Sequence, residues 1–590
     1  MKNKILITLM LVAVVFSCEN ALTKEPDFIS EETIFEDENL TEAYLAEAYN
    51  SVPFQIMTGE AGNGMGDIGA LGAEYTAFAN WQQPNRMASR AYSADSGAAD
   101  LTYWAYSNIR ELNYFIEHIQ DSESFSQDYI DSKLAEARFL RAFTYFEMAK
   151  RYGGVPIITK VQSEDDPEDE LYPVRNTEKE VYDFIYNETN AVAQLFSTTK
   201  TGALGRADRY ATLALQSRAM LYAASIAQFG EVQLDGVVGI PASDAQLYYK
   251  RSYDASQLVI DAGYVLYNQN PSDKVANLIA LFQDEGNDEV IFAKVYEPFI
   301  KGHSLDNLST PQGFNASWNS NFPVFYDIVE KFGFVEGSAL TNVSRNQLTA
   351  ANTWDINEFF GERDPRFRAA VFYPEYEWQS GTVYFHTSTT YTENGVTKTV
   401  TNRNTILDRN GEDWPAAAQP RCVRNTSLLL RKRLNESNLD PILDSSGQDY
   451  YIFRLGEILL NHAEAAYYLT SVDNQIALDD LNELRDRAGM PALTEVTEDN
   501  LRNERQVELA FEDHRYWDIV RWRTAEDELN GTNLKGLTFT YNLDTNRYTI
   551  TLKNGESFTR AFGSERYYMP LSIDWIVDNP KLKQNPDYIN

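Results

Sequence analysis

The clearest pattern in the chain is a helical spacing of apolar residues over residues 126–152. Phe139, Phe143 and Phe146 recur at positions i, i+4 and i+7, a spacing that brings side chains to one face of an α-helix. The stretch starts near Ser126 with Asp128 in its first turn, and two consecutive glycines followed by Pro156 stop it. The pattern therefore predicts one long helix with a defined start and stop.

Shorter stretches with the same spacing predict further helices on both sides. They cover residues 40 to just before Pro53, 101–119, 178–196, 206–229, 249–262, 451–469, 474–488, 498–523 and 572–578. The stretch 206–229 is rich in alanine, and small side chains let helix backbones approach closely. Helix pairs at a pitch of roughly 34 residues are typical of tetratricopeptide units, although the signature of that repeat is not cleanly met. We expect a mostly α fold built as a tetratricopeptide-like helix-pair array.

The middle of the chain, residues 265–450, has a different pattern. It is rich in Asn, Ser, Thr, Gly, Pro and aromatic residues, with short strand-like runs at 290–293 and 383–385, which predicts an irregular, loop-rich lobe inserted into the array. The helical part is then divided into residues 36–264 and 451–523. A C-terminal segment, 524–590, holds two more strand-like runs at 537–541 and 548–552.

The N-terminus predicts export. Lys2 and Lys4 precede a nearly unbroken apolar run that stops at Ser17-Cys18. This run is too short for a stable membrane span and reads as a signal peptide over residues 1–17. Its last residues resemble a bacterial lipobox, so we expect Cys18 to carry lipid and residues 18–35 to form an acidic tether. The alternative is an ordinary signal peptide with a chance cysteine.

Composition and charge narrow the function. The 590 residues are 43% hydrophobic and 23% charged, as in a globular protein. Asp and Glu outnumber Lys and Arg by 87 to 51, and loss of residues 1–17 brings the net charge from −36 to −38. This surplus disfavours nucleic acid as a partner, since nucleic-acid binders neutralise phosphates with basic groups. With Cys18 lipidated, Cys422 has no disulfide partner and is expected to be a buried, inert thiol rather than a nucleophile.

The remaining motifs do not support a catalytic, metal or cofactor site. Residues 64–69 match G-x-G-x-x-G, but glycines flank the match on both sides and no hydrophobic strand leads into it. The chain has no P-loop, G-x-S-x-G or H-E-x-x-H motif, and its five histidines lack the spacing of metal ligands. The acidic run 165–170 is expected to be a solvated loop. We therefore predict no catalytic residue, metal or cofactor.

Five segments in order resemble a known family. They are 133–142 with 151–156, the RDPRF turn at 363–367, 454–465, the ER…EL…E…R…D…RW pattern at 504–522, and 579–586. Together they are similar to the SusD/RagB outer-membrane lipoproteins of Bacteroidetes over essentially the whole chain. One departure is Asp513, where the family usually has glycine at a turn. The charged residues of these motifs are expected to form ion pairs between helices rather than to catalyse a reaction.

The resemblance implies a function. Members of this family sit on the cell surface, bind oligosaccharides without turnover, and act as a lid over a SusC-like TonB-dependent transporter in the outer membrane. A neutral glucan such as laminarin is the expected ligand, since the net charge disfavours anionic glycans, although Arg86 and Arg90 could offset this locally. Two alternatives stay open: a peptide-binding or scaffold lipoprotein, and a surface glycoside hydrolase, for which no motif is found.

Two loops have the composition of a sugar site, with aromatic rings for stacking beside polar groups for hydrogen bonds. The resemblance implies that both regions meet at the glycan. The candidate ligand contacts in the first loop are Tyr75, Trp81, Gln82, Asn85 and Arg86, and those in or near the second are Tyr296, Trp318 and Asn319. The alternative for each ring is ordinary packing within the loop.

Overall fold

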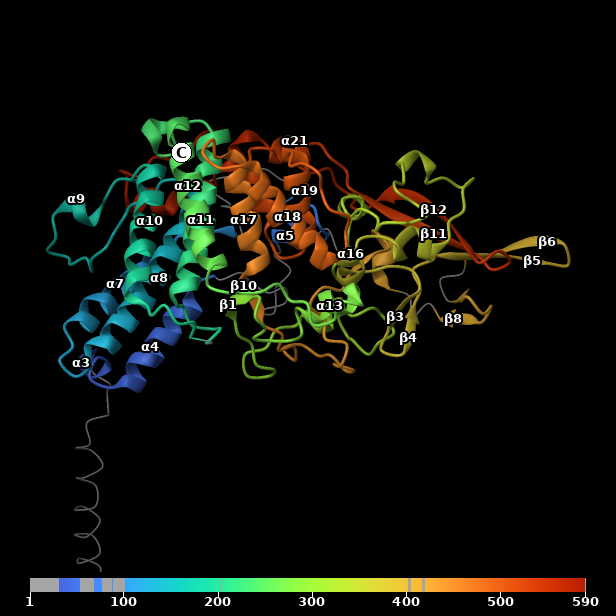
Figure 1. Cartoon of the computed structure of the whole chain (residues 1–590), viewed down its shortest axis with the longest axis horizontal. Helices are drawn as coiled ribbons and strands as arrows, with labels where there is room; N and C mark the ends of the chain where they lie inside the picture. The colour runs from blue at the N-terminus through green and yellow to red at the C-terminus, as the bar shows by residue number, and fades with distance from the viewer. Residues whose placement is uncertain are drawn as a thin grey trace, which may run out of the picture.

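The helices follow one another as a row of packed neighbours. The computed structural model describes residues 31–53, 68–76, 88, 101–201, 203–401, 405–415 and 420–588. The row consists of α3 (Glu31–Ile34), α4 (Glu38–Ser51), α7 (Tyr106–Gln120), α8 (Gln127–Tyr152), α10 (Glu178–Leu195), α11 (Arg209–Phe229), α12 (Ala245–Ile260), α17 (Leu455–Tyr468), α18 (Asn474–Ala488) and α19 (Glu498–Glu508). Helix α12 packs against α17 although residues 261–454 separate them in sequence (Figure 1). The array is therefore interrupted by the inserted lobe, as its pattern predicts.

The long predicted helix is confirmed as α8, together with its boundaries. The Ser126 side chain accepts a hydrogen bond from the Tyr129 N–H at its start. Gly153 ends it at φ +76°, a conformation that favours glycine. At Gly154 an added Cβ would lie 2.0 Å from the Asn176 carbonyl oxygen, so that position also requires glycine. Local sequence chemistry sets both ends of this helix.

The lobe and the C-terminal segment contain shorter elements. The short helices are α5 (Ile68–Leu71), α9 (Glu168–Leu171), α13 (Lys274–Ala280), α14 (Leu305–Ser309), α15 (Tyr326–Val329), α16 (Pro365–Ala370), α20 (Arg515–Arg521), α21 (Ala525–Leu529) and α22 (Ile573–Asp578). The strands are β1 (Val290–Lys294), β2 (Val371–Phe372), β3 (Tyr376–Trp378), β4 (Gly381–Val383), β5 (Ser388–Glu393), β6 (Val396–Val400), β7 (Thr405–Leu407), β8 (Asp413–Pro415), β9 (Leu429–Leu430), β10 (Tyr450–Arg454), β11 (Lys535–Asn542) and β12 (Arg547–Asn554).

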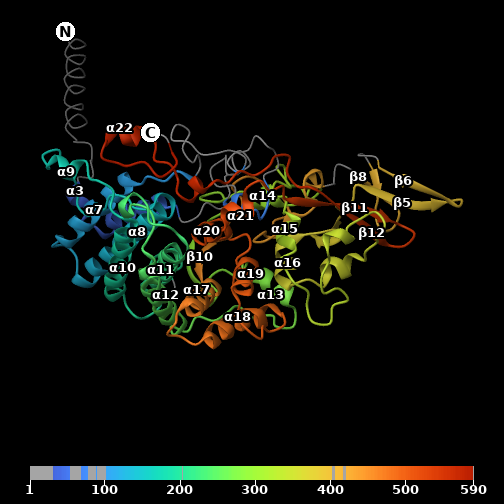
Figure 2. The ribbon, with the colours of Figure 1, turned by 90° about the horizontal axis from the view of Figure 1, so that it is seen from above.

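The largest sheet joins the lobe to the C-terminal segment. The two predicted strand-like runs of the C-terminal segment are strands β11 and β12, which pair antiparallel, and the sheet order is β12-β11-β5-β6. Strand β11 pairs with β5 in parallel, Thr540 facing Ser388. The β5–β6 hairpin extends away from the helices in two perpendicular views (Figures 1 and 2). Most buried apolar side chains, from Phe35 to Leu582, belong to one connected cluster that includes both helices and lobe.

Two predicted helices differ in the structure. Residues 450–454, at the start of the predicted helix 451–469, form strand β10, which pairs with β1. The predicted helix 498–523 is divided into α19 and α20, because Phe511 and Asp513 adopt left-handed backbone conformations at φ 63° and 64°. An α-helix cannot continue through such residues, so the chain turns here.

Candidate functional site

Among the predicted contacts that the structure describes, Trp318 is the one presented to solvent. Its side chain is 57% exposed, on a loop that follows α14. The loop is held by its own polar residues: the Asn321 side chain donates to the Trp318 carbonyl oxygen at 2.5 Å, and the Asn319 side chain donates to the Ala316 carbonyl oxygen at 2.7 Å. Because these bonds from side chains to backbone carbonyls lie within the loop itself, the indole needs no rearrangement of its support before it meets a ligand.

A second loop lies directly beside Trp318. Asn307, fully buried on α14, donates one hydrogen bond to the Ser317 hydroxyl at 3.2 Å and another to the Pro441 carbonyl oxygen at 2.6 Å. The Asn315 side chain also donates to the Leu439 carbonyl oxygen at 3.2 Å. Helix α14 therefore connects the Trp318 loop to residues 435–446.

This second loop and its neighbour add exposed apolar side chains. The Phe299 N–H donates to the Asp444 carbonyl oxygen at 3.0 Å, which brings the tight turn 297–301 against the second loop. The large apolar side chains exposed on these two segments are Phe299, Ile300, Leu439, Ile442 and Leu443. We call these five residues with Trp318 the apolar rim. In the sequence, these residues are apolar positions within polar, glycine-containing loops, a pattern that no motif marks.

Three other predicted contacts lie below the surface. Tyr75 pairs with Val324 in a β-bridge and packs edge-on against Phe322, with ring centroids 5.6 Å apart. Tyr296 packs edge-on against His303 at 4.9 Å. Tyr75, Tyr296 and Asn319 are 3%, 5% and 5% exposed. Neither tyrosine ring thus offers a stacking face to solvent here, and ligand contact by these three residues stays a prediction.

The remaining predicted site residues are not part of the structure described. Trp81, Gln82, Asn85 and Arg86 lie outside the described residues, as does Cys18. The Tyr296 N–H donates to Asp449, and the loop that carries Trp318 and Asn319 is bonded to Leu439 through Asn315, so both segments contact residues 439–449. The relation of these segments to the first predicted loop stays a prediction.

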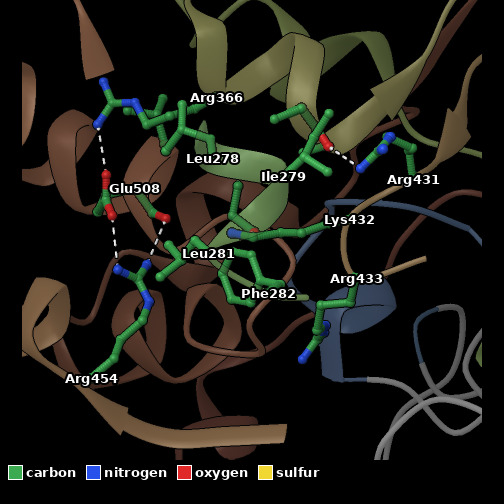
Figure 3. Close-up of a pocket in the computed structure, with 14 residues that line it drawn as sticks. Leu278, Ile279, Leu281, Phe282, Arg366, Arg431, Lys432, Arg433, Arg454 and Glu508 are labelled. Atoms are coloured by element: carbon green, nitrogen blue, oxygen red, sulfur yellow. Dashed lines mark hydrogen bonds and ion pairs between the residues drawn. The ribbon is translucent and has the colours of Figure 1, made fainter. Parts of the chain in front are cut away.

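A second group of charged residues lies in the interior between lobe and helices. Arg454 donates to Glu289 at 2.8 Å, to Glu508 at 2.9 Å and to both oxygens of Glu512 at 2.7 and 2.8 Å. Figure 3 shows Glu508 between Arg454 and Arg366, which lies 3.1 Å from Glu508. The predicted ion pairs between helices are confirmed, among them that of Arg505 on α19 with Asp518 on α20.

The space within this charged group is small. The cavity in Figure 3 measures about 20 Å³, which is room for about one water molecule. Burial raises the carboxylate pKa, but Arg454 and Lys432 more than offset it and hold the pKa of Glu512 at about 2. The Glu512 carboxylate is therefore an ionised partner of Arg454 and Lys432 that joins these elements, and the cavity is too small to admit a sugar.

The single described cysteine, Cys422, is predicted to be an inert thiol. Cys422 is buried as expected, and burial raises the pKa of its thiol, so the thiol stays protonated and unreactive.

Among the described residues, no group of three or more His, Cys, Asp or Glu side chains is arranged to hold a metal ion. Among the described helices, none has the length and apolar content to span a bilayer.

The sequence matches two known protein families. Residues 288–588 match the family described as the SusD family, and residues 22–221 match one described as "Starch-binding associating with outer membrane". The chain belongs to the SusD family. This confirms the resemblance on which the expected fold rests. The two family descriptions also associate the chain with carbohydrate binding and with the outer membrane.

Individual relatives agree with this membership. SusD-like protein P38 of Formosa agariphila is 22% identical over 98% of this chain and 97% of its own length. A SusD-like protein of Bacteroides fragilis superposes with a TM-score of 0.72 at 22% identity, covering 95% of this chain and 99% of that one. A solved structure named "Laminarin binding SusD-like protein" has a TM-score of 0.59 at 17% identity over 94% of this chain and all of the other. These structures confirm the SusD-like, helix-rich fold.

Proposed function

We propose that this SusD-family chain captures a polysaccharide or oligosaccharide at the cell surface without chemical turnover. The observation that carries the proposal is Trp318, whose indole is exposed on a loop held by its own asparagines. A sugar stacks its C–H face on such a ring, while nearby polar groups bind its hydroxyls. Trp81, with Gln82, Asn85 and Arg86, completes the site from the first loop in this proposal.

A neutral glucan such as laminarin is the proposed ligand. The net charge of −36 disfavours anionic glycans through like-charge repulsion. The similarity to a protein named for laminarin binding gives the first polysaccharide to test. The apolar rim supports the same choice, since it offers exposed apolar area to the C–H faces of a neutral sugar.

We further propose that lipid on Cys18 anchors the chain in the outer membrane and that it delivers glycan to a SusC-like TonB-dependent transporter. The position of Cys18 at the end of the apolar leader supports the anchor. Replacement by Cys18→Ser should release the chain from the membrane fraction, and mass spectrometry should find no acyl chain on it. Affinity purification of the wild-type chain should recover the transporter. Finding the wild-type chain in the soluble fraction would contradict the lipid anchor. Recovery of the wild-type chain without a transporter would contradict the delivery step.

Affinity gel electrophoresis with laminarin tests the ligand and the site together. The wild-type chain should be retarded, and Trp318→Ala should lose about ten-fold or more in affinity, as for an exposed aromatic hot spot. Tyr172→Ala, which removes an exposed ring at the end of α9, is the matched control and should migrate as wild type. Equal retardation of Trp318→Ala and wild type would overturn the site assignment. Release of reducing sugar would instead favour a hydrolase, and peptide binding without retardation would favour a peptide-binding protein.

A further inference from the structure

A separate hollow lies where α11 ends. It has a volume of about 390 Å³, within the range of small-ligand sites. Its walls come from the end of α11 and the following loop, from the turn after α20, and from the C-terminal residues 564–568 and 586–587. Aromatic and charged side chains line it, among them Phe229, Arg523, Tyr567 and Tyr568. None of them belongs to the Trp318 loop or to the apolar rim.

The floor of this hollow is rigid. The Arg523 guanidinium lies 4.9 Å from the ring centroids of both Tyr567 and Tyr568. It also donates to the Tyr568 hydroxyl oxygen at 2.7 Å and to the Val520 carbonyl oxygen at 3.0 Å. The Tyr568 hydroxyl in turn donates to the buried Glu178 carboxylate at 2.7 Å. Because each planar group is fixed by another, binding a ligand here costs little side-chain entropy.

The sides of the hollow carry polar groups that are not engaged elsewhere. Within the described residues, the Gln233 amide, the Glu565 carboxylate and the Ser564 hydroxyl have no hydrogen bond or ion pair. They stand beside the rings of Phe229 and Tyr567. Planar hydrogen-bonding groups around aromatic side chains suit a ligand that has both hydroxyl groups and C–H faces.

The charge of the hollow restricts the ligand further. Three carboxylates line it, from Glu231, Glu565 and Asp587, against the single guanidinium of Arg523. An anionic ligand would be repelled, whereas the hydroxyls of a neutral sugar can donate to carboxylates and accept from the amide.

We propose that this hollow is a second carbohydrate site that binds a short neutral oligosaccharide. Arg523 and the two tyrosines form its floor, and Gln233 and Glu565 bind hydroxyl groups. The ligand class rests on the proposed function, while the location does not. Two sites on one chain would retain a polysaccharide longer than either alone, since a strand released by one site stays close to the other.

Hydrogen–deuterium exchange of the purified full chain tests the second site separately from the first. Laminari-, malto-, cello- and xylo-hexaose are each added at millimolar concentration. Protection of peptides covering 229–233 and 563–568 supports the second site, and protection of 313–321 reports the Trp318 site. Protection at 313–321 alone overturns this inference and leaves the proposed function standing. Absence of protection in both regions with every sugar overturns both.

Variants give a second readout. Gln233→Ala combined with Glu565→Gln should abolish protection at 563–568 and weaken binding there about ten-fold or more, while protection at 313–321 persists. Since neither side chain has a hydrogen bond or ion pair within the part of the chain that the structure describes, the melting temperature should stay unchanged. Glu495→Gln, an exposed carboxylate on another surface, is the control and should behave as wild type. Unchanged protection at 563–568 in the double variant overturns the assignment of these two residues.

Discussion

Arg505 on α19 donates through Nε to both carboxylate oxygens of Asp518 on α20, at 2.9 and 2.8 Å. Asp518 also accepts from Arg521 at 2.9 Å, and all three side chains are buried. This contact joins two helices across the turn at 509–514, where the sequence pattern predicts one continuous helix. The charged motif of the family therefore serves to fix a break in the helix.

Replacement by Asp518→Asn should destabilise the chain by about 3–5 kcal/mol, because it leaves buried guanidinium groups without a full counter-charge. Urea denaturation gives the free energy of unfolding. The control is Asp254→Asn, because Asp254 and its partner Lys250 are both about half exposed. The free energy of unfolding of this variant should change by less than about 0.5 kcal/mol. Equal effects of the two variants would show that the buried pair does not hold the break.

Asp513 lies at φ 64° in the same turn. Substitutions at this position can test conformational strain separately from hydrogen bonding. Its carboxylate accepts from the Gly69 N–H and the Tyr450 hydroxyl, each at 3.3 Å. Both Asp513→Gly and Asp513→Ala lose these bonds and should be less stable than wild type. The glycine variant should be the more stable of the two by about 1 kcal/mol, because glycine adopts the left-handed region without a Cβ clash. Equal melting temperatures of the two variants would contradict this.

Asn307 connects the Trp318 loop to residues 435–446 through its two side-chain hydrogen bonds. Asn307→Ala should cost about 1–3 kcal/mol of stability and should also weaken laminarin retardation, although Asn307 itself is buried. Asn410→Ala, in an exposed turn at a different place, should leave retardation unchanged. If Asn307→Ala lowers the melting temperature but keeps full affinity, the link between the two loops is irrelevant to binding.

The buried carboxyl group of Glu74 should make the free energy of unfolding depend on pH. Burial, with a contribution from Asp513, raises its pKa from 4.5 to about 8, although its Oε1 accepts from the Phe511 N–H at 2.8 Å. Between pH 4.5 and 8 the folded chain keeps a proton that the unfolded chain has released, so this group's stabilising contribution declines as pH rises. Glu74→Gln keeps an oxygen acceptor for Phe511 and removes this dependence.

The measurement is urea denaturation of wild type and Glu74→Gln at several pH values from 5 to 8. The stability difference between variant and wild type should grow in favour of the variant with rising pH, by at most about 1.4 kcal/mol per pH unit. Glu495→Gln should follow the wild-type profile. Parallel profiles of wild type and Glu74→Gln would show that Glu74 is ionised in the folded chain over this range.

The sequence by itself determined the features that depend on near neighbours. Ser126 and Gly153 fix the ends of α8 through contacts within a few residues, and apolar spacing located most of the array. The family motifs were also visible as local strings, and they led to the correct family and fold.

Only the tertiary structure decided burial and long-range pairing. Trp318 is exposed and Trp378 is buried, although both lie in polar stretches of the same lobe. The pairing of β11 with β5 and the hollow beside Arg523 each join segments far apart in the chain. The Arg505–Asp518 pair spans only 13 residues, but it forms because the chain turns between α19 and α20. Local spacing carries no information about such contacts, because they exist only once distant segments have packed together.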